Sequence, residues 1–215
     1  MSIFAKYDQF RYIYPPRPEI KINPIHLASL GTEWIAQPKY NGCCSVVFIN
    51  GFKEYSLYNR KAGRLFLQKP LKCTALNDSR KFMVLCGEYL NRNQNGEDGK
   101  PFNHKFIIWD ILVWKGLYLI GETFENRLEI LHKLFGTSTG QVSAQGISMF
   151  NYLHTTKVED VYMAPTYVNH LKQLYDDIIK TDLYEGLVLK RARGKLQHGF
   201  NKRNNTDWQL KARRY

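Results

Sequence analysis

Short apolar runs separated by turn-forming residues dominate the pattern along the chain, and this spacing predicts a protein rich in strands. The β-branched run 43–49 ends at Asn50-Gly51, a dipeptide typical of tight hairpin turns, and 55–59 fits the returning strand. A strand is also expected at 34–37. Further buried strands are predicted over 82–90, 105–112, 185–190 and 208–212.

Two segments repeat apolar residues at helical spacing instead. In 123–135, Thr123 can cap the start of a helix and Gly136 can end it, and 168–180 fits a second helix. The apolar stripes are Phe124, Leu128, Leu131 and Phe135 in the first, and Leu171, Leu174, Tyr175 and Ile178 in the second. Since strands outnumber helices and do not alternate with them regularly, the predicted fold class is α+β, with mainly antiparallel sheets flanked by helices.

The composition is that of a folded protein. The chain has 215 residues, 44% hydrophobic and 14% aromatic, which is enough to bury a core. We expect a single domain over 1–215. The proline-rich stretch 14–18 suits neither a helix nor a central strand, so 1–30 is expected to form an extended N-terminal arm on the surface.

Several classes of protein are disfavoured. No apolar run is long enough to span a bilayer, and the N-terminus lacks the apolar stretch of a signal peptide. The cysteines and histidines show no metal-binding spacing. We interpret the cysteines, Cys43, Cys44, Cys73 and Cys86, as reduced core thiols of a cytoplasmic protein.

Charge gives the first functional indication. The sequence holds 31 Lys and Arg against 19 Asp and Glu, a net charge of +12, and its pI is about 9.5. Such a domain often binds a polyanion, although a basic surface also serves solubility. The excess gathers in the last quarter, which predicts a phosphate-facing strip containing Lys190, Arg191, Arg193, Lys195, Lys202, Arg203, Lys211, Arg213 and Arg214.

Charged residues also interrupt the apolar strands, where burying them needs a reason. Lys39 is expected at a turn between two strands, and the others are Glu88, Asp110, Glu185, Lys190 and Lys211. A lysine nucleophile accounts for this set, because neighbouring cations such as Lys190 and Lys211 would depress its pKa. The same cations would stabilise a phosphorus undergoing displacement, Glu185 could hold a divalent metal, and Trp109 could stack on a base.

In chain order, these residues resemble the collinear motifs of the covalent nucleotidyltransferases, which include the ATP-dependent DNA ligases, RNA ligases and mRNA capping enzymes. The segments that carry the resemblance are Lys39-x-Asn41-Gly42, Arg60, Gly87-Glu88, Trp109-Asp110, Glu185-Gly186-Leu187-Val188-Leu189-Lys190 and Trp208-Gln209-Leu210-Lys211. Each residue alone also fits a structural role. Their joint occurrence, from about Trp34 to the C-terminus, favours the enzyme.

The resemblance implies a role for each residue. Lys39 would be the nucleophile that forms lysyl-AMP, Gln37 would contact the adenine amino group, and Trp109 would stack on adenine. Arg60 and Glu88 would contact the ribose, with Arg60 later touching the 5′-phosphate. Glu185 and Glu88 would bind the metal, and Lys190 and Lys211 would contact the α-phosphate. Nucleic acid would meet Arg60, Arg191, Arg193, Lys195, Lys202 and Arg203.

The stretch from Trp109 to Arg127 resembles DNA ligases more than capping enzymes, and the small size is that of viral ligases. Three positions depart from the DNA ligase pattern: Cys44 and Gln209 replace basic residues, and Asn41 replaces the commoner aspartate. These departures leave an RNA ligase or a mixed DNA/RNA ligase as an alternative. The three departures affect the expected preference for DNA or RNA strands more than they affect adenylation.

The resemblance therefore implies an ATP-dependent polynucleotide ligase that uses Mg²⁺ or Mn²⁺ and acts on nicked duplex DNA, RNA or a hybrid as a monomer. Family members usually continue into an OB-fold, and we expect none here because the chain stops four residues after Lys211. The N-terminal arm could then supply some strand contacts. The alternative from another class is a non-catalytic, basic nucleic-acid-binding protein.

Overall fold

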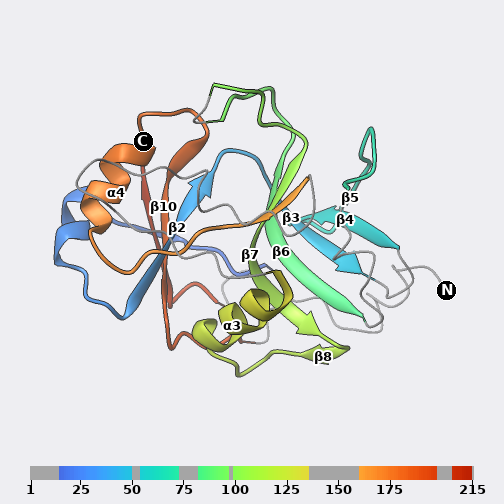
Figure 1. The fold of residues 1–215 in the computed structure, drawn as a ribbon. Coiled ribbons are helices and arrows are strands. Elements are labelled where there is room, and N and C mark those ends of the chain that lie inside the picture. The colour runs from blue at the N-terminus through green and yellow to red at the C-terminus, as the bar shows by residue number, and fades with distance from the viewer. Residues whose placement is uncertain are drawn as a thin grey trace.

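Two mainly antiparallel sheets form most of the computed structural model, which describes residues 15–49, 54–72, 82–96, 99–135, 160–197 and 205–214 (Figure 1). The smaller sheet has the strand order β1 (Ile20–Lys21), β11 (Gln209–Arg213), β10 (Tyr184–Arg191), β2 (Trp34–Tyr40). The larger has the order β5 (Arg64–Leu65), β4 (Tyr55–Asn59), β3 (Cys43–Ile49), β6 (Met83–Leu90), β7 (Lys105–Trp114), β8 (Leu117–Tyr118), with β9 (Val161–Met163) also paired to β7.

The long strands lie where the apolar pattern predicts them, within a residue or two at their ends, except that β2 extends three residues beyond the predicted 34–37. The turn predicted at Asn50-Gly51 falls outside the described residues, but β3 and β4 pair antiparallel with Ile49 opposite Tyr55, as a hairpin requires. Two pairs, β1 with β11 and β7 with β9, are parallel. The predicted α+β class with mainly antiparallel sheets is confirmed.

Both predicted helices are present, as α3 (Phe124–Phe135) and α4 (Leu171–Ile178). The hydroxyl of Thr123 accepts a hydrogen bond of 3.2 Å from the backbone N–H of Asn126, which is the predicted N-cap. Every residue of the two predicted apolar stripes is buried. A short 3₁₀ helix, η1 (Pro24–Ser29), was not expected, and its Leu27 packs beside α4 in the core of the smaller sheet.

Each sheet has its own apolar core. One lies between the larger sheet and α3 and also takes in Trp208. The other joins the smaller sheet to α4 and η1. Trp109 packs against both cores, so the two sheets meet near this residue.

The proline-rich segment departs from prediction. Residues 1–14 lie outside the described residues, but Pro15 and Pro16 are buried, and β1 pairs with β11 through Ile20 opposite Leu210. Burial of the prolines and strand pairing therefore fix part of the predicted arm to the smaller sheet, although Ile20 and Ile25 are exposed.

Candidate active site

A cavity of about 580 Å³ lies between the two sheets. All eight residues predicted to contact ATP line it, although they come from positions 37 to 211 of the chain. The structure thus brings the predicted set together. The role of each member stays a prediction.

The smaller sheet forms one wall, and its register explains which side chains face the cavity. Residues directly opposite each other on paired strands share a face. Val188 of β10 lies opposite Gln37 of β2 and Lys211 of β11, so these three form one row across the sheet. The next row along joins Lys39 and Arg213 through Gly186. Lys39 was expected in a turn but lies within β2, one residue before its end.

The glycine in the second row is required by the backbone. Gly186 has φ of +137°, and a Cβ at this position would lie 2.0 Å from the carbonyl oxygen of Ala212. A register shift in the pairing of β10 with β2 falls between Tyr184 and Gly186. Gly186 therefore lets β10 and β11 pack closely, directly beside the position where the Glu185 carboxylate faces the cavity.

The larger sheet supplies the opposite wall. Glu88 of β6 lies directly across from Cys44 of β3, and Trp109 comes from β7. Arg60, just after β4, is exposed and also lines the cavity. At Cys44, where DNA ligases usually carry arginine, burial and the neighbouring Glu88 raise the pKa of the thiol to about 12. This thiol is protonated at neutral pH and contributes no charge to the wall.

One carboxylate links two of the cavity's cations. Glu185 Oε2 lies 2.5 Å from Lys39 Nζ and 2.8 Å from Arg213 Nη2. Neither Lys39 nor Glu185 is fully buried: about a quarter of each side chain is exposed. Solvent and a ligand in the cavity can therefore reach this pair.

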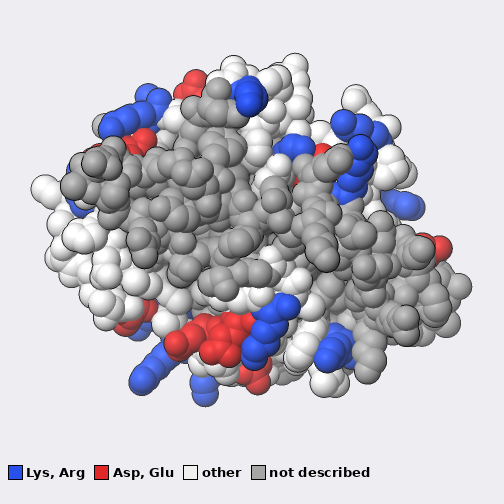
Figure 2. Space-filling model, viewed as in Figure 1, with Lys and Arg blue, Asp and Glu red and all other residues white. Residues whose placement is uncertain are grey.

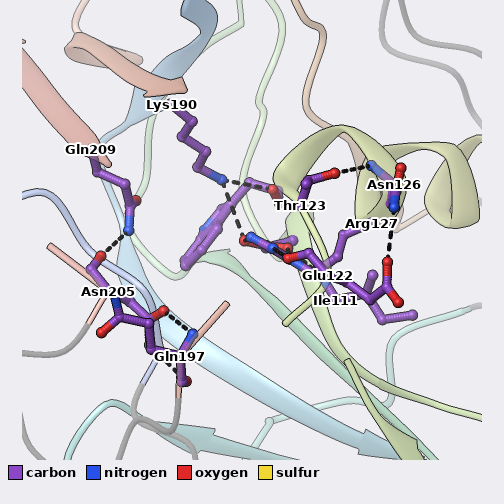
Figure 3. A network of polar contacts seen from close by, with 11 residues as sticks. Ile111, Glu122, Thr123, Asn126, Arg127, Lys190, Gln197, Asn205 and Gln209 are labelled. Atoms are coloured by element: carbon purple, nitrogen blue, oxygen red, sulfur yellow. Dashed lines mark hydrogen bonds and ion pairs between the residues drawn. The ribbon is translucent and has the colours of Figure 1, made fainter. Parts of the chain in front are cut away.

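A buried ionic network supports the cavity from behind (Figure 3). Arg127 of α3 holds Asp110 with two hydrogen bonds of 2.8 and 3.0 Å, and both side chains are fully buried. Lys190 reaches from β10, donates to the Trp109 carbonyl at 2.9 Å and lies 3.9 Å from Asp110. Burial would raise the pKa of Asp110, but Arg127 and Lys190 together lower it. Burial lowers the pKa of Lys190 to about 8.

Two further groups in the cavity have shifted pKa values. Burial raises the pKa of Glu88 to about 7, against the effect of Lys39. For Lys211, burial and then the charges of Arg213, Lys39 and Arg17 lower the pKa. The cavity has seven basic and two acidic side chains in its lining, so an anionic ligand is favoured there.

Gln37 carries an unusual buried amide. The residue is 2% exposed, and both its Nε2 and Oε1 lack a hydrogen-bond partner among the described residues. An unsatisfied buried donor and acceptor are costly, so they need a partner that the described residues do not supply. A ligand with both a donor and an acceptor on one edge, such as a nucleobase, fits this requirement.

A divalent metal also fits the cavity in part. The described residues contain no group of three His, Cys, Asp or Glu side chains that could hold an ion. Glu88 and Glu185 both line the cavity, and the charge of Glu185 acts on the pKa of Glu88. Mg²⁺ is commonly bound by one or two carboxylates plus the phosphates of a substrate. Glu88 and Glu185 would supply the carboxylates, and a bound nucleotide would supply the phosphate oxygens.

Three members of the predicted basic strip, Lys190, Lys211 and Arg213, line the cavity, whereas its other described members lie apart from it. Arg191, Arg193 and Lys195 are exposed and do not line it, while Lys202 and Arg203 fall outside the described residues. Segment 192–196 runs beside the start of α3 through backbone hydrogen bonds. Figure 2 shows acidic side chains gathered over the region of α3 with basic ones beside them. Binding of nucleic acid by the strip remains a prediction.

Two arginines that line the cavity had no predicted contact with ATP: Arg17, and Arg213, which was expected only in the basic strip. Arg213 had a detectable signal, because it follows Gln209 and Lys211 at the two-residue period of a strand. Arg17 had none, since its position depends on how β1 pairs with a strand almost two hundred residues later in the chain.

The arrangement of strands and helices is that of solved DNA ligase structures. A mycobacterial DNA ligase D complexed with ATP superposes with a TM-score of 0.60 at 17% identity, over 95% of this chain. The ligase domain of LigD from M. tuberculosis gives 0.57 at 17% identity over 94%. The chain has the fold of a DNA ligase domain.

A Lig E DNA ligase shares this ligase-domain fold with a TM-score of 0.51 and 14% identity over 94% of the chain. The chain spans 62%, 61% and 70% of the lengths of these three structures, about three fifths of the first two. No protein-family model and no curated protein matches the sequence. Among the described residues, no helix is both long enough and apolar enough to cross a membrane.

Proposed function

We propose that the protein is an ATP-dependent polynucleotide ligase, similar to DNA ligases, that seals nicks through a lysyl-AMP intermediate on Lys39. The observation that carries the proposal is the position of Lys39. It faces a basic cavity that also holds a hydrogen-bonded carboxylate and the unpartnered amide of Gln37. The fold likeness to a ligase complexed with ATP agrees with this nucleotide.

In the first step, Lys39 Nζ attacks the α-phosphorus of ATP. The N–P bond forms, the bond to the bridging oxygen breaks, and pyrophosphate leaves with that electron pair. The amine must first lose its proton, and Glu185 Oε2, 2.5 Å away, is an acceptor within reach. Lys211 and Lys190 would neutralise charge on the phosphate, and Trp109 would stack on the adenine.

Mg²⁺ or Mn²⁺, held by Glu185 and Glu88 together with the substrate phosphates, would neutralise charge on the triphosphate. Glu88 and Arg60, which line the opposite wall, would contact the ribose hydroxyls. In the second step an oxygen of the 5′-phosphate displaces Lys39 from the AMP phosphorus. In the third, the 3′-hydroxyl attacks the 5′-phosphorus and AMP leaves. Arg60 and the strip of Arg191, Arg193 and Lys195, with Lys202 and Arg203, would bind the nicked strands.

The test is covalent labelling of the full chain with α-labelled ATP or GTP and Mg²⁺, followed by a denaturing gel. We expect label from ATP and none from GTP. Lys39→Ala should abolish the label, because no other amine takes its place opposite Gly186. Lys172→Ala is the matched control, since this exposed lysine pairs with Asp176 on α4, outside the cavity.

Label from GTP would instead indicate capping chemistry, and label that survives Lys39→Ala would refute the assignment of the nucleophile. If neither nucleotide labels the protein, the non-catalytic nucleic-acid-binding alternative is favoured. For a labelled protein, nicked DNA, nicked RNA and hybrid duplexes then distinguish a DNA ligase from an RNA or mixed ligase. This comparison is needed because Cys44 is uncharged at a position where DNA ligases usually carry a cation.

A further inference from the structure

Residues 16–18 form part of the cavity wall, although they lie far from the other lining residues in sequence. Arg17 precedes Pro18, which disfavours helical conformations of the Arg17 backbone and favours extended ones. The segment is then fixed to β11, because Lys211 Nζ donates to the Pro18 carbonyl at 3.1 Å and β1 pairs with β11. Arg17 is therefore presented to the cavity from a rigid backbone.

Arg17 belongs to a group of neighbouring cations whose charges act on one another. After burial, the charges of Arg213, Lys39 and Arg17 are what lower the pKa of Lys211. Arg213 already donates to Glu185, whereas Arg17 donates to Glu19 at 3.0 Å in a partly exposed ion pair. Exposed pairs contribute little to stability, so a polyphosphate can compete with Glu19 for the guanidinium.

The chemistry of adenylation leaves a need for such a group. In an in-line displacement the leaving group departs on the side of phosphorus opposite the nucleophile, carrying new negative charge. Lys39 attacks the α-phosphorus, and Lys190 and Lys211 are assigned to the α-phosphate, which leaves the two terminal phosphates to other cations. A guanidinium matches two phosphate oxygens at once, in a geometry that an ammonium cannot reproduce.

We propose that Arg17 binds the β- and γ-phosphates of ATP and the pyrophosphate that leaves from them. The inference rests on the proposed function and adds to it a residue that acts on the leaving group. It also predicts the reverse step. There, a pyrophosphate oxygen attacks the AMP phosphorus, the bond to Lys39 breaks, the lysine nitrogen regains a proton and ATP is released.

The experiment follows that reverse step with the full chain. Adenylated protein is freed of nucleotide and mixed with increasing pyrophosphate and Mg²⁺, and both loss of label and formation of ATP are measured. We expect Arg17→Ala to raise the half-saturating pyrophosphate concentration and the KM for ATP by about 10- to 100-fold, the size of one or two lost charged hydrogen bonds. Arg17→Lys should give values between those of the unchanged protein and Arg17→Ala, because lysine keeps the positive charge but cannot donate two parallel hydrogen bonds. Lys172→Ala should match the unchanged protein.

Sealing of a nick by the preformed adduct is the second measurement, since pyrophosphate has left by then. Arg17→Ala should leave it unchanged. A normal pyrophosphate response in Arg17→Ala would overturn the proposal, and so would a defect confined to nick binding, which would assign Arg17 to the nucleic acid. If the unchanged protein forms no adduct, the proposed function fails. Calorimetric binding of pyrophosphate to the unchanged protein and to Arg17→Ala then still tests Arg17: weaker binding by the variant supports its role, and equal binding refutes it.

Discussion

Asp110→Asn is the substitution whose effect the structure predicts most directly. It keeps the size of the side chain and removes one negative charge from the fully buried network. Arg127 loses the anion that it holds through two hydrogen bonds, and Lys190 loses the anion 3.9 Å from its Nζ. Arg127 then stays buried without its counter-charge, and Lys190, whose pKa burial already lowers to about 8, loses the anion that raises it.

The magnitude follows from this imbalance. Removing one partner of a buried ion pair typically destabilises a protein by about 3–5 kcal/mol, because the other charge stays desolvated. We expect a loss in this range for Asp110→Asn. With a denaturant slope of about 2–3 kcal/mol per molar urea, the unfolding midpoint should fall by roughly 1–2 M.

Urea unfolding followed by tryptophan fluorescence measures the loss, since Trp109 and Trp208 lie beside the network. Asp176→Asn is the matched control: its pair with Lys172 is exposed, so the change should stay within about 1 kcal/mol. Adding Arg127→Met to Asp110→Asn should recover part of the loss, because it removes the larger unpaired cation. A midpoint for Asp110→Asn within experimental error of the unchanged protein would refute this account of the network.

The dependence on pH gives an independent check. Arg127 and Lys190 hold the pKa of folded Asp110 below its ordinary value of 3.8, against the effect of burial. The stability that its ionised form contributes is therefore fully present above that ordinary value and is lost as the pH falls through the lower folded pKa. The gap between the unchanged protein and Asp110→Asn should narrow in strong acid, where Asp110 takes up a proton.

Two further variants test the cavity. Burial raises the pKa of Glu88 from 4.5 to about 7, so its contribution to stability is complete below the lower value and is lost as the pH rises through the higher one. Glu88→Gln should therefore raise the free energy of unfolding by up to about 3 kcal/mol near pH 8 and change it little near pH 4, whereas the exposed control Glu129→Gln should show no such trend. Gln37→Met should stabilise the free protein by about 1–3 kcal/mol, because the buried amide has no hydrogen-bond partner among the described residues, while raising the KM for ATP. Loss of stability in Gln37→Met, or a flat pH response in Glu88→Gln, would contradict these assignments.

The sequence by itself determined the local elements of this protein. Apolar period and turn residues placed β3, β4 and the stripes of both helices, since these features depend on residues close together in the chain. Charges inside apolar strands also singled out Glu88 and Glu185, because burying a charged side chain is costly.

Tertiary structure decided how those residues meet. The sharing of one carboxylate by Lys39 and Arg213 depends on the register of three strands, and strand register is set by packing over the whole sheet. The pairing of Asp110 with Arg127 requires α3 to pack on β7. Arg17 reaches the cavity only because β1 pairs with β11. Such contacts form between residues far apart in the chain, so no local pattern records them.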